Sequence, residues 1–582
     1  MSMEISNAKL AKILRDVAAA NTIKKMGNIF QIRAYENAAD SVEHSTAEIQ
    51  DLWEEGKLDT IPAVGVSIKG YLDELFKTGK VKHFEELQKG IPEIVFELLD
   101  VPGVGPKTAQ KIADLGVKNI ADLEIQIKTG RLAKKGFSAK LAERIMEGLR
   151  EIKSRTGRML LPYASVQAEK IVAYLKANTE VIDAHPLGSL RRMVATIGDL
   201  DFSVSTKNSQ KVVDYFCQMP AVSRVVDKGP SKATVLLKSG LQLDLLVGDP
   251  KSYGALLQHF TGSKDHNIHL RTLVQEKGYS LSEYGVRKGG KLVRTETEEK
   301  FYKLLGMQIP PPEIREDTGE IEIALKHKLP ELVKLSDIKG DLHTHSNFPI
   351  DSPSHGPGIN SIAEIIQKAQ DLGYKFIGIS DHPPGFNTSS ESERIRWVEK
   401  RTKFIHQLQK RTKNIRVLNG LEIDILGDGS LSIPDEALET LDYCIAGIHS
   451  GHRGAKEVIT KRLLAAINSP HVDIISHPTN RLLNERESSE ADWPEIFKAA
   501  VENNKPLEIN AFPNRLDLRD DLVRVALQYG VKFVIDTDAH KVEQLDNMLF
   551  GVVVARRGWA EAKNVVNTWD WTKFADWFKI KS

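Results

Sequence analysis

The spacing of hydrophobic positions predicts a helical first part of the chain, followed by parts that contain strands. Residues 1–100 predict several short helices, for example at 7–14, where apolar residues recur at helical spacing. From 160 to 312, β-branched and apolar residues alternate with polar ones, as in half-buried strands. The clearest of these strands are expected at 197–204, 234–238 and 241–247. The pattern predicts a multidomain protein, α-helical at its start and α+β in its middle.

Beyond residue 339, strand and helix patterns alternate regularly. The prolines at 310–312 end the preceding pattern, so a linker is expected over 313–339. The expected strands are 375–380, 417–425, 443–448, 472–476, 507–511 and 532–535, and the expected helices are 361–371, 455–468, 493–503 and 517–529. Such alternation predicts a parallel sheet or an α/β barrel over 340–582.

Two segments of the helical region resemble each other. Residues 61–66 and 101–106 are both Pro/Gly-containing turns that precede an amphipathic helix, which indicates a repeated helix-hairpin-helix. Backbone N–H groups at such a turn can hold a phosphate oxygen without reading a base sequence. The first copy has Ala63 where the second has Gly103. The residues expected to contact a nucleic-acid backbone are Gly65, Gly103, Gly105 and Lys107.

Composition excludes several classes of protein. A chain of 582 residues exceeds one ordinary hydrophobic core, and 41% hydrophobic with 27% charged residues is a soluble globular balance. No apolar run approaches the ~20 residues of a membrane span, and Met1–Asp16 does not read as a signal peptide. The two cysteines, Cys217 and Cys444, exclude a disulfide scaffold. We therefore expect a cytoplasmic protein without a membrane segment.

The net charge of +1 conceals an uneven distribution. Residues 101–312 hold 33 basic and 21 acidic side chains, a surplus of +12, whereas both flanking regions are acidic. This surplus suits a bound polyanion, and a solvated basic face without a partner is the alternative.

Paired acids in the middle region suggest divalent-metal chemistry. Asp199 and Asp201 open a strand and share one of its faces, and Asp244 is an acid within an apolar strand. Carboxylates held together repel unless cations lie between them, and phosphoryl transfer uses two Mg²⁺ ions in this way. Arg191 or Arg192, which follow Gly188 and Ser189, could neutralise a triphosphate.

Histidines concentrate in the last region, where ten of the 17 lie between His343 and His540. Several imidazoles and carboxylates fall at the ends of predicted strands, which converge on one rim in a barrel. Mixed His and carboxylate ligands suit Mn²⁺, Zn²⁺ or Fe²⁺. His406, His452 and His471 are interpreted as packed or surface residues. The candidate ligands are His343, His345, His382, Glu422, His449, His477, Asp538 and His540.

In this order of motifs, residues 1–312 resemble DNA polymerase family X, the polymerase-beta-like group. The resemblance implies a helical domain at 1–90 with the first hairpin, a second helical DNA-binding domain at 91–158, and a nucleotidyltransferase palm and thumb at 159–312. Asp199, Asp201 and Asp244 would be catalytic and bind Mg²⁺ or Mn²⁺. The residues implied to bind the incoming nucleotide are Gly188, Ser189, Arg192, Gly198, Phe260, Gly262, Asn267 and Arg271.

Residues 340–582 resemble a PHP domain, a seven-stranded α/β barrel that binds up to three metals. The resemblance implies that the eight candidate ligands bind Mn²⁺, Zn²⁺ or Fe²⁺. For the ninth ligand, which the family usually takes from a Ser-Asp-Gly sequence, this chain offers Asp351 or His355. Related domains hydrolyse phosphoesters, which implies attack on a DNA 3′ end or at an abasic site.

One departure concerns the first hairpin. Tyr71 stands where the deoxyribose-phosphate lyase of the family uses a Schiff-base lysine, and Lys69 is the nearby amine. His259 stands where relatives usually have tyrosine, at the position that contacts the nucleotide sugar.

The resemblance as a whole implies a gap-filling repair polymerase with a 3′–5′ exonuclease and possible cleavage at abasic sites. Its partners would be dNTPs and gapped or primer–template DNA, and we expect a monomer. Two alternatives stay open: a PHP phosphoesterase with a non-catalytic DNA-holding front half, or a recruiter of repair partners. The intact acids and the complete ligand set argue against both.

Overall fold

The structure is a computed structural model, and most of the chain is described in it. The described residues are 7–580 except 27, 44–48, 55, 62, 100, 102–103, 130, 132–137, 139–140, 143–144, 147–157, 239–240 and 352–353. Gly103, expected to contact a nucleic-acid backbone, lies outside them. Among the described helices, none meets the length and hydrophobicity that a bilayer crossing demands.

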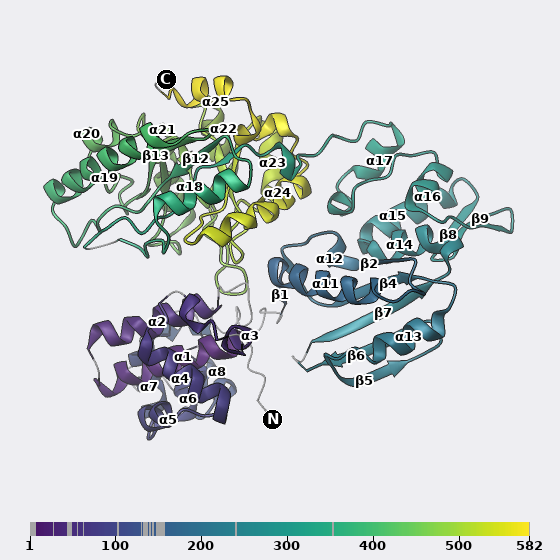
Figure 1. Ribbon diagram of the computed structural model, residues 1–582, viewed down its shortest axis with the longest axis horizontal. Coiled ribbons are helices and arrows are strands. Elements are labelled where there is room, and N and C mark those ends of the chain that lie inside the picture. The colour runs from purple at the N-terminus through teal and green to yellow at the C-terminus, as the bar shows by residue number, and fades with distance from the viewer. Residues whose placement is uncertain are drawn as a thin grey trace.

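Helices make up the regular structure of the described N-terminal residues, which Figure 1 shows in purple and dark blue. The first group is α1 (Asn7–Lys24), α2 (Ile29–Glu43), α3 (Ile49–Glu54), α4 (Val66–Thr78) and α5 (Lys82–Gln88), and the second is α6 (Glu93–Leu98), α7 (Pro106–Asp114) and α8 (Ile120–Lys128). Each group has its own apolar core, around Leu14 and Leu72 in the first and around Val95 and Ile112 in the second.

The glycines directly before α4 and α7 do not have left-handed backbone angles. Gly65 and Gly105 are the N-cap residues of α4 and α7, and their φ angles of −70° and −86° are open to most residues. The left-handed residue of the first turn is Ala63, at φ +57°. Ala63 occupies the place of Gly103 in the repeat, so the first copy has this turn without the glycine that usually permits it.

A five-stranded mixed sheet forms the palm. Its strands run in the order β2 (Asp183–Pro186), β4 (Leu200–Ser205), β7 (Gln242–Gly248), β6 (Lys232–Leu237) and β5 (Val222–Lys228). Only β4 and β7 are parallel, and the pairing sets Asp201 directly opposite Asp244. The palm also contains β1 (Met159–Leu160), α11 (Leu161–Lys176), α12 (Gly188–Arg191), β3 (Thr196–Ile197) and α13 (Ser209–Cys217).

The thumb follows the palm and extends into the predicted linker. It contains α14 (Tyr253–Thr261), α15 (Lys264–Gln275), β8 (Tyr279–Ser282), β9 (Gly285–Lys288), β10 (Lys291–Val293) and α16 (Glu298–Leu304). Residues 313–339, expected to connect domains without regular structure, include α17 (Glu320–Leu325), which packs into the thumb core through Ile321. The buried Arg315 forms an ion pair with Glu298. Polar contacts therefore fix a segment whose prolines suggested a break.

Seven parallel strands form the C-terminal barrel, paired in chain order. They are β11 (Gly340–Asp341), β12 (Phe376–Ile379), β13 (Arg416–Asp424), β14 (Tyr443–Gly447), β15 (Ile474–Ile475), β16 (Leu507–Asn510) and β17 (Phe533–Asp536). The helices are α18 (Ile362–Asp371), α19 (Glu391–Arg411), α20 (Asp435–Leu438), α21 (Lys456–Asn468), α22 (Trp493–Glu502), α23 (Asp520–Tyr529), α24 (Met548–Arg557) and α25 (Trp571–Phe578). The six predicted strands and four predicted helices are all present within a few residues, whereas β11, α19, α20, α24 and α25 were not predicted.

Candidate functional site

The three predicted acids of the palm come together at the start of two neighbouring strands. Asp199 precedes β4, and Asp201 and Asp244 are register partners on β4 and β7. Burial raises the pKa of Asp201 to about 6, and the negative charges of Asp244 and Asp199 add to the effect. Among the described residues, no arginine or lysine forms an ion pair with any of the three acids. The cluster therefore has uncompensated negative charge, which fits divalent cations.

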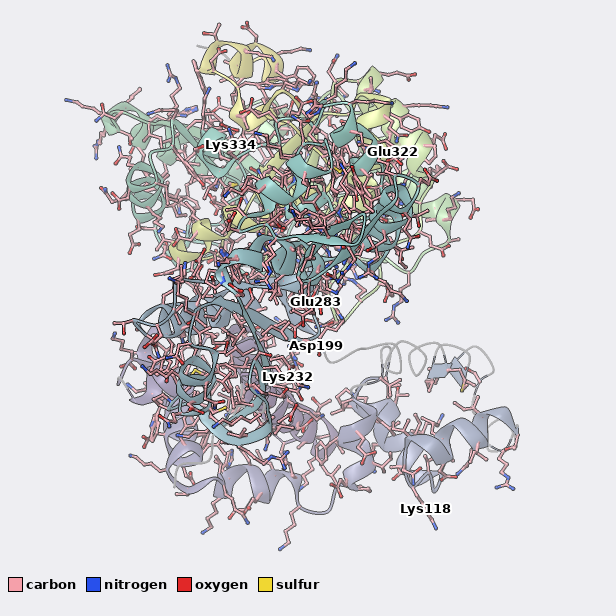
Figure 2. The ribbon with its side chains drawn as sticks, turned by 90° about the vertical axis from the view of Figure 1, so that its right-hand side faces the viewer. Lys118, Asp199, Lys232, Glu283, Glu322 and Lys334 are labelled. Atoms are coloured by element: carbon pink, nitrogen blue, oxygen red, sulfur yellow. The ribbon has the colours of Figure 1, made fainter. Side chains whose placement is uncertain are left out.

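The short helix α12 carries the predicted triphosphate residues beside these acids. Gly188 is in the left-handed region at φ +55°, and a Cβ placed there would lie 3.4 Å from Oδ2 of Asp201. The peptide N–H of Leu187 donates to the backbone oxygen of Asp201 at 2.8 Å. Ser189 follows Gly188 in α12. The glycine therefore brings α12 close to the acid cluster, where a side chain would be strained. Figure 2 labels Asp199 in the palm.

Arg192 is held by the thumb and the following segment. Its Nε lies 2.9 Å from Oε1 of Glu316, and its Nη1 donates to the backbone oxygen of Thr261 at 2.6 Å. Arg191 instead pairs with Glu298. The sequence left both arginines open as triphosphate ligands. Arg191 connects the palm to the thumb through Glu298. Arg192 lies next to Gly262, and a Cβ atom added to that glycine would lie 3.0 Å from Nη1 of Arg192.

The remaining predicted nucleotide residues lie mostly on α14 and α15. The amide of Asn267 accepts from Gln258 at 2.7 Å and donates to the backbone oxygen of His259 at 2.7 Å. Arg271 lies 3.3 Å from the His259 ring nitrogen. Phe260 packs partly buried against the apolar cluster of α14, and Gly198, before β4, faces the guanidinium of Arg158. In this structure, the polar side chains of Asn267 and Arg271 contact other protein groups.

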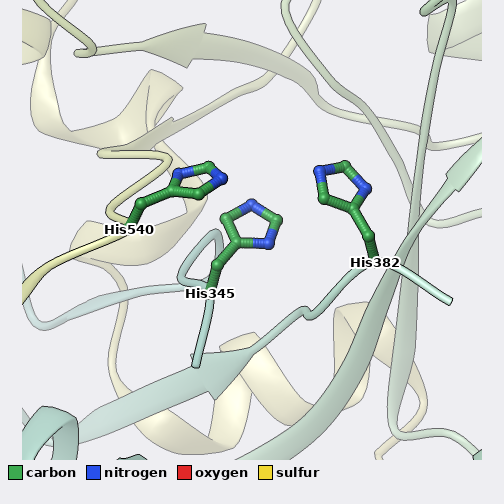
Figure 3. Close-up of side chains that lie close together, drawn as sticks. All are labelled: His345, His382 and His540. Atoms are coloured by element: carbon green, nitrogen blue, oxygen red, sulfur yellow. The ribbon is translucent and has the colours of Figure 1, made fainter. Parts of the chain in front are cut away.

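The histidines and acids of the barrel form one compact cluster, as the sequence predicted. Among the described residues, four groups have ligand atoms within 4.8 Å of one another. They are His345, His382 and His540; His355, His382 and His449; His343, His345, Glu422 and Asp538; and Glu422, His449 and His477. Figure 3 shows the rings of His345, His382 and His540 near one another, although they come from three separate loops. Shared members connect the groups, which suits a centre with several metal ions.

The structure separates the two candidates for the ninth ligand. His355 lies in the cluster, with its Nε2 3.1 Å from Oδ1 of Asp424 and its ring 4.5 Å from that of His382. Asp351 is exposed and belongs to none of the four groups. The loop between β11 and α18 therefore points an imidazole into the cluster where the family usually supplies a carboxylate.

Glu422, on β13, is the electrostatic centre of the cluster. Its carboxylate oxygens lie 2.8 Å from Nε2 of His477, 2.9 Å from that of His343 and 3.2 Å from that of His382. Burial alone would raise the pKa of Glu422, but the surrounding imidazoles hold it well below its usual range. Burial conversely lowers the pKa of His477 to about 3, so that ring is neutral and able to bind a metal.

The donor set of the cluster fits divalent metal ions. The buried Nδ1 atoms of His345, His382 and His477 have no hydrogen-bond partner in the part of the chain that the structure describes. Buried imidazole nitrogens without partners are costly, and carboxylates packed among them supply the negative charge that a cation needs. His and carboxylate together are the ligands that Mn²⁺, Zn²⁺ and Fe²⁺ accept.

Sequence reasoning missed two acids and one arginine of this site. Asp424 shares the strand face of Glu422 and lies 2.7 Å from Nδ1 of His449. Glu508 is fully buried on β16, where its Oε1 lies 2.6 Å from Nδ1 of His343. Arg515 has its Nε 3.5 Å from Asp538, and its buried Nη1 lacks a hydrogen-bond partner among the described residues. The i, i+2 spacing from Glu422 could have found Asp424, and an acid within an apolar strand is the signal for Glu508.

At the lyase position of the first hairpin, Tyr71 contacts another ring and Lys69 is ion-paired. The ring of Tyr71 stacks on that of His83 at a centroid distance of 5.0 Å. Lys69, the nearest amine in sequence, forms an ion pair with Asp59. This arrangement gives no support to Schiff-base chemistry at Tyr71.

Comparisons with known proteins agree with both parts of the fold. Family models match as follows: a helix-hairpin-helix domain at 5–81, a SAM-like helix-hairpin-helix tandem at 95–151, a DNA polymerase beta thumb at 256–316 and a PHP domain at 341–512. The DNA polymerase/3′-5′ exonuclease PolX of Bacillus subtilis is 36% identical over 569 residues, which cover 96% of each chain. Probable phosphatases of Caldicellulosiruptor saccharolyticus and Clostridium acetobutylicum are 30% and 29% identical over 196 and 209 residues. They match 32% and 34% of this chain, and 75% and 78% of their own length.

Fold and sites together define a nucleotidyltransferase joined to a metal-binding barrel of the phosphoesterase type. The near-full-length match to a PolX protein makes the assignment more specific. The chain belongs to the PolX family, the family X DNA polymerases that carry a C-terminal PHP domain. The fold class expected from the sequence is confirmed.

Proposed function

We propose that the chain is a DNA-directed DNA polymerase whose PHP barrel is a 3′–5′ exonuclease, in agreement with the name of its Bacillus subtilis relative. The observation that supports the first half is the pairing of Asp201 with Asp244 beside Asp199. These carboxylates would hold two Mg²⁺ or Mn²⁺ ions, which neutralise developing charge on the transferring phosphoryl group when bound. Arg192 and the backbone of Gly188 and Ser189 would orient the triphosphate.

The second half of the proposal concerns the barrel cluster. Its residues, with His355 as the ninth ligand, would hold up to three Mn²⁺, Zn²⁺ or Fe²⁺ ions, whose chemistry is to polarise a phosphodiester and acidify water. Glu508 fixes the ring of His343 by accepting from its Nδ1, which leaves Nε2 for a metal. Arg515 would hold a phosphate oxygen with its unpartnered Nη1.

The biological setting belongs to the proposal as well. Helix-hairpin-helix domains and a basic middle region suit gapped or primer–template DNA, and dNTPs are the second substrate. We propose that the enzyme fills short gaps in base excision repair in the cytoplasm as a monomer, and that its barrel also cleaves at abasic sites. Lyase chemistry is not part of the proposal.

Separate variants test the two halves. On DNA with a one-nucleotide gap, Asp201→Asn should abolish extension and leave degradation from the 3′ end intact. His343→Ala should abolish degradation and leave extension intact. Extension that survives Asp201→Asn would refute the polymerase assignment, and degradation that survives His343→Ala would refute the exonuclease assignment. A wild type that shows neither extension nor degradation would be a protein that only holds DNA.

A further inference from the structure

A groove on the outer face of α19 adjoins the metal cluster. It encloses about 460 Å³ and is lined by side chains of α19 and by Phe348. Phe348 also lines the pocket that contains His345, His355 and His382. This shared side chain places the groove beside the pocket that contains the cluster. Figure 1 shows α19 at the outer end of the barrel, away from the palm.

The charges along this groove are mostly positive. Arg396, Lys400 and Lys403 line it, against Glu399 alone. Lys400 and Lys403 are exposed, and the ammonium group of neither forms an ion pair or hydrogen bond with another described residue. Like charges one turn apart on a helix repel each other. The positive charges of the groove therefore favour the binding of an anionic partner.

Aromatic side chains lead from the groove to the cluster. Phe404 is 42% exposed, and its ring centroid lies 5.5 Å from that of Phe348. Phe348 in turn lies 5.8 Å from Trp397, which lines the metal pocket. Exposed aromatic faces beside cations are the usual platform for unpaired bases, because every base offers a π face.

The buried side of α19 fixes this surface relative to the metal ligands. Arg401 donates from Nε to Asp381 at 2.7 Å, next to His382. Asp381 also accepts from the hydroxyl of Ser346 at 3.0 Å, next to His345. The indole N–H of Trp397 donates to the backbone oxygen of Pro349 at 2.9 Å. These hydrogen bonds fix the position of the groove relative to the candidate ligands His345 and His382.

We propose that the α19 groove binds the 3′-terminal nucleotides of a single DNA strand and leads them to the barrel cluster. This inference rests on the proposed exonuclease function and names its substrate path. From Phe404 to Trp397 the helix rises about 10 Å, which is the length of about three nucleotides at 3.4 Å each. Bases stack on Phe404 while Lys400 and Lys403 neutralise phosphates.

The test uses the full-length protein loaded with Mn²⁺. Two substrates are compared: a single-stranded oligodeoxynucleotide longer than the groove, and bis-p-nitrophenyl phosphate, which reaches the metals without the groove. Lys400→Glu combined with Lys403→Glu should raise the KM for the oligonucleotide about tenfold and flatten its dependence on log salt by about 0.7 per lysine. Hydrolysis of the small diester and primer extension should be unchanged.

A matched control reverses two charges at the other end of the same helix. Lys410→Glu combined with Arg411→Glu changes the net charge equally, outside the groove, and should leave the KM for the oligonucleotide unchanged. A KM that rises equally in both double variants would refute the groove, because only general charge would then matter.

A second variant keeps the charges. Phe404→Ala should raise the KM for the oligonucleotide without changing the salt dependence, since it removes stacking alone. If both groove variants degrade the oligonucleotide like the wild type while the diester is hydrolysed, the groove proposal is wrong. If the wild type hydrolyses neither substrate, the proposed exonuclease function fails instead.

Discussion

Arg557, on the last long helix of the barrel, donates from Nη1 to the backbone oxygen of Arg192 in the palm at 2.8 Å. The same Nη1 lies 3.1 Å from Glu316, whose carboxylate also accepts from Nε of Arg192 at 2.9 Å. Asp520 holds the Nε of Arg557 at 2.7 Å. A barrel residue therefore positions an arginine that we assign to the incoming triphosphate.

We expect Arg557→Ala to weaken nucleotide binding at the polymerase site. Its loss removes one charge-assisted contact to Glu316 and one to the Arg192 backbone, so Arg192 loses part of its orientation. A contact of this kind contributes about 1.5–3 kcal/mol, which predicts a rise in the KM for dNTP of about tenfold or more. Single-nucleotide incorporation kinetics measure this, with kcat changing less than KM.

The neighbouring arginine supplies the control for this prediction. Arg556 bonds to Glu313 and to the backbone oxygen of Val333, at the same interface but away from Arg192. Arg556→Ala should therefore leave the KM for dNTP near the wild-type value. Equal effects of the two substitutions would mean that Arg557 acts only through general stability of the interface.

The barrel strands could be predicted because each is an apolar run with a chemically distinctive residue at its end. The helix α19 could not, because two of its buried residues are arginines: Arg394 and Arg401 face inward and are paired with backbone oxygens and Asp381. Two charged side chains on the inward face interrupt the apolar period there. The segment around Arg315 likewise contains a buried charge, which forms an ion pair with Glu298.

The candidate metal site was largely predictable, and its supporting residues were not. Histidines that follow predicted strands can be recognised in the sequence as candidate ligands. Glu508 and His343, however, are 165 positions apart in the sequence, and the barrel fold brings them into contact. The choice between Asp351 and His355 likewise depended on the path of one loop. Sequence patterns report local periodicity, and long-range pairing is a property of the fold.

We expect His355→Ala to reduce bound metal and exonuclease activity, and Asp351→Ala to change neither. His355 shares a group with His382 and His449, whereas Asp351 is exposed outside all groups. His355→Asp restores the residue type usual in the family and should retain more activity than His355→Ala. Elemental analysis of the purified protein, alongside degradation of 3′ ends, measures both effects. The assignment would be wrong if Asp351→Ala were the variant that loses metal.

Glu508→Gln should weaken metal binding without removing any proposed ligand. Glu508 accepts from Nδ1 of His343 at 2.6 Å and so orients that ring. Replacement of such an outer partner typically costs 10–100-fold in metal affinity or activity. Titration of metal-free protein with Mn²⁺, followed by diester hydrolysis, should therefore show a shifted midpoint and a recoverable maximum. A lowered maximum that excess Mn²⁺ does not restore would contradict a purely orienting role.

The buried carboxylate of Glu298 should make the thumb sensitive to acid. Burial alone would raise its pKa, but Arg315 and Arg191 lower it to about 2 from the usual 4.5. The pKa of Glu298 is lower in the folded state than in the unfolded state, so ionisation of this carboxyl group stabilises the fold. The stabilisation is complete above about pH 4.5 and is lost as the pH falls toward 2. It amounts to about 3 kcal/mol. Glu298→Gln mimics the protonated state, so the wild type should melt well above this variant at pH 7, and the difference should shrink steadily below pH 4.

Glu296→Gln, which alters an exposed pair with Lys300, is the control and should melt like the wild type throughout. A difference between wild type and Glu298→Gln that stayed constant from pH 7 to pH 3 would show that the two arginines do not hold this carboxylate in its charged form.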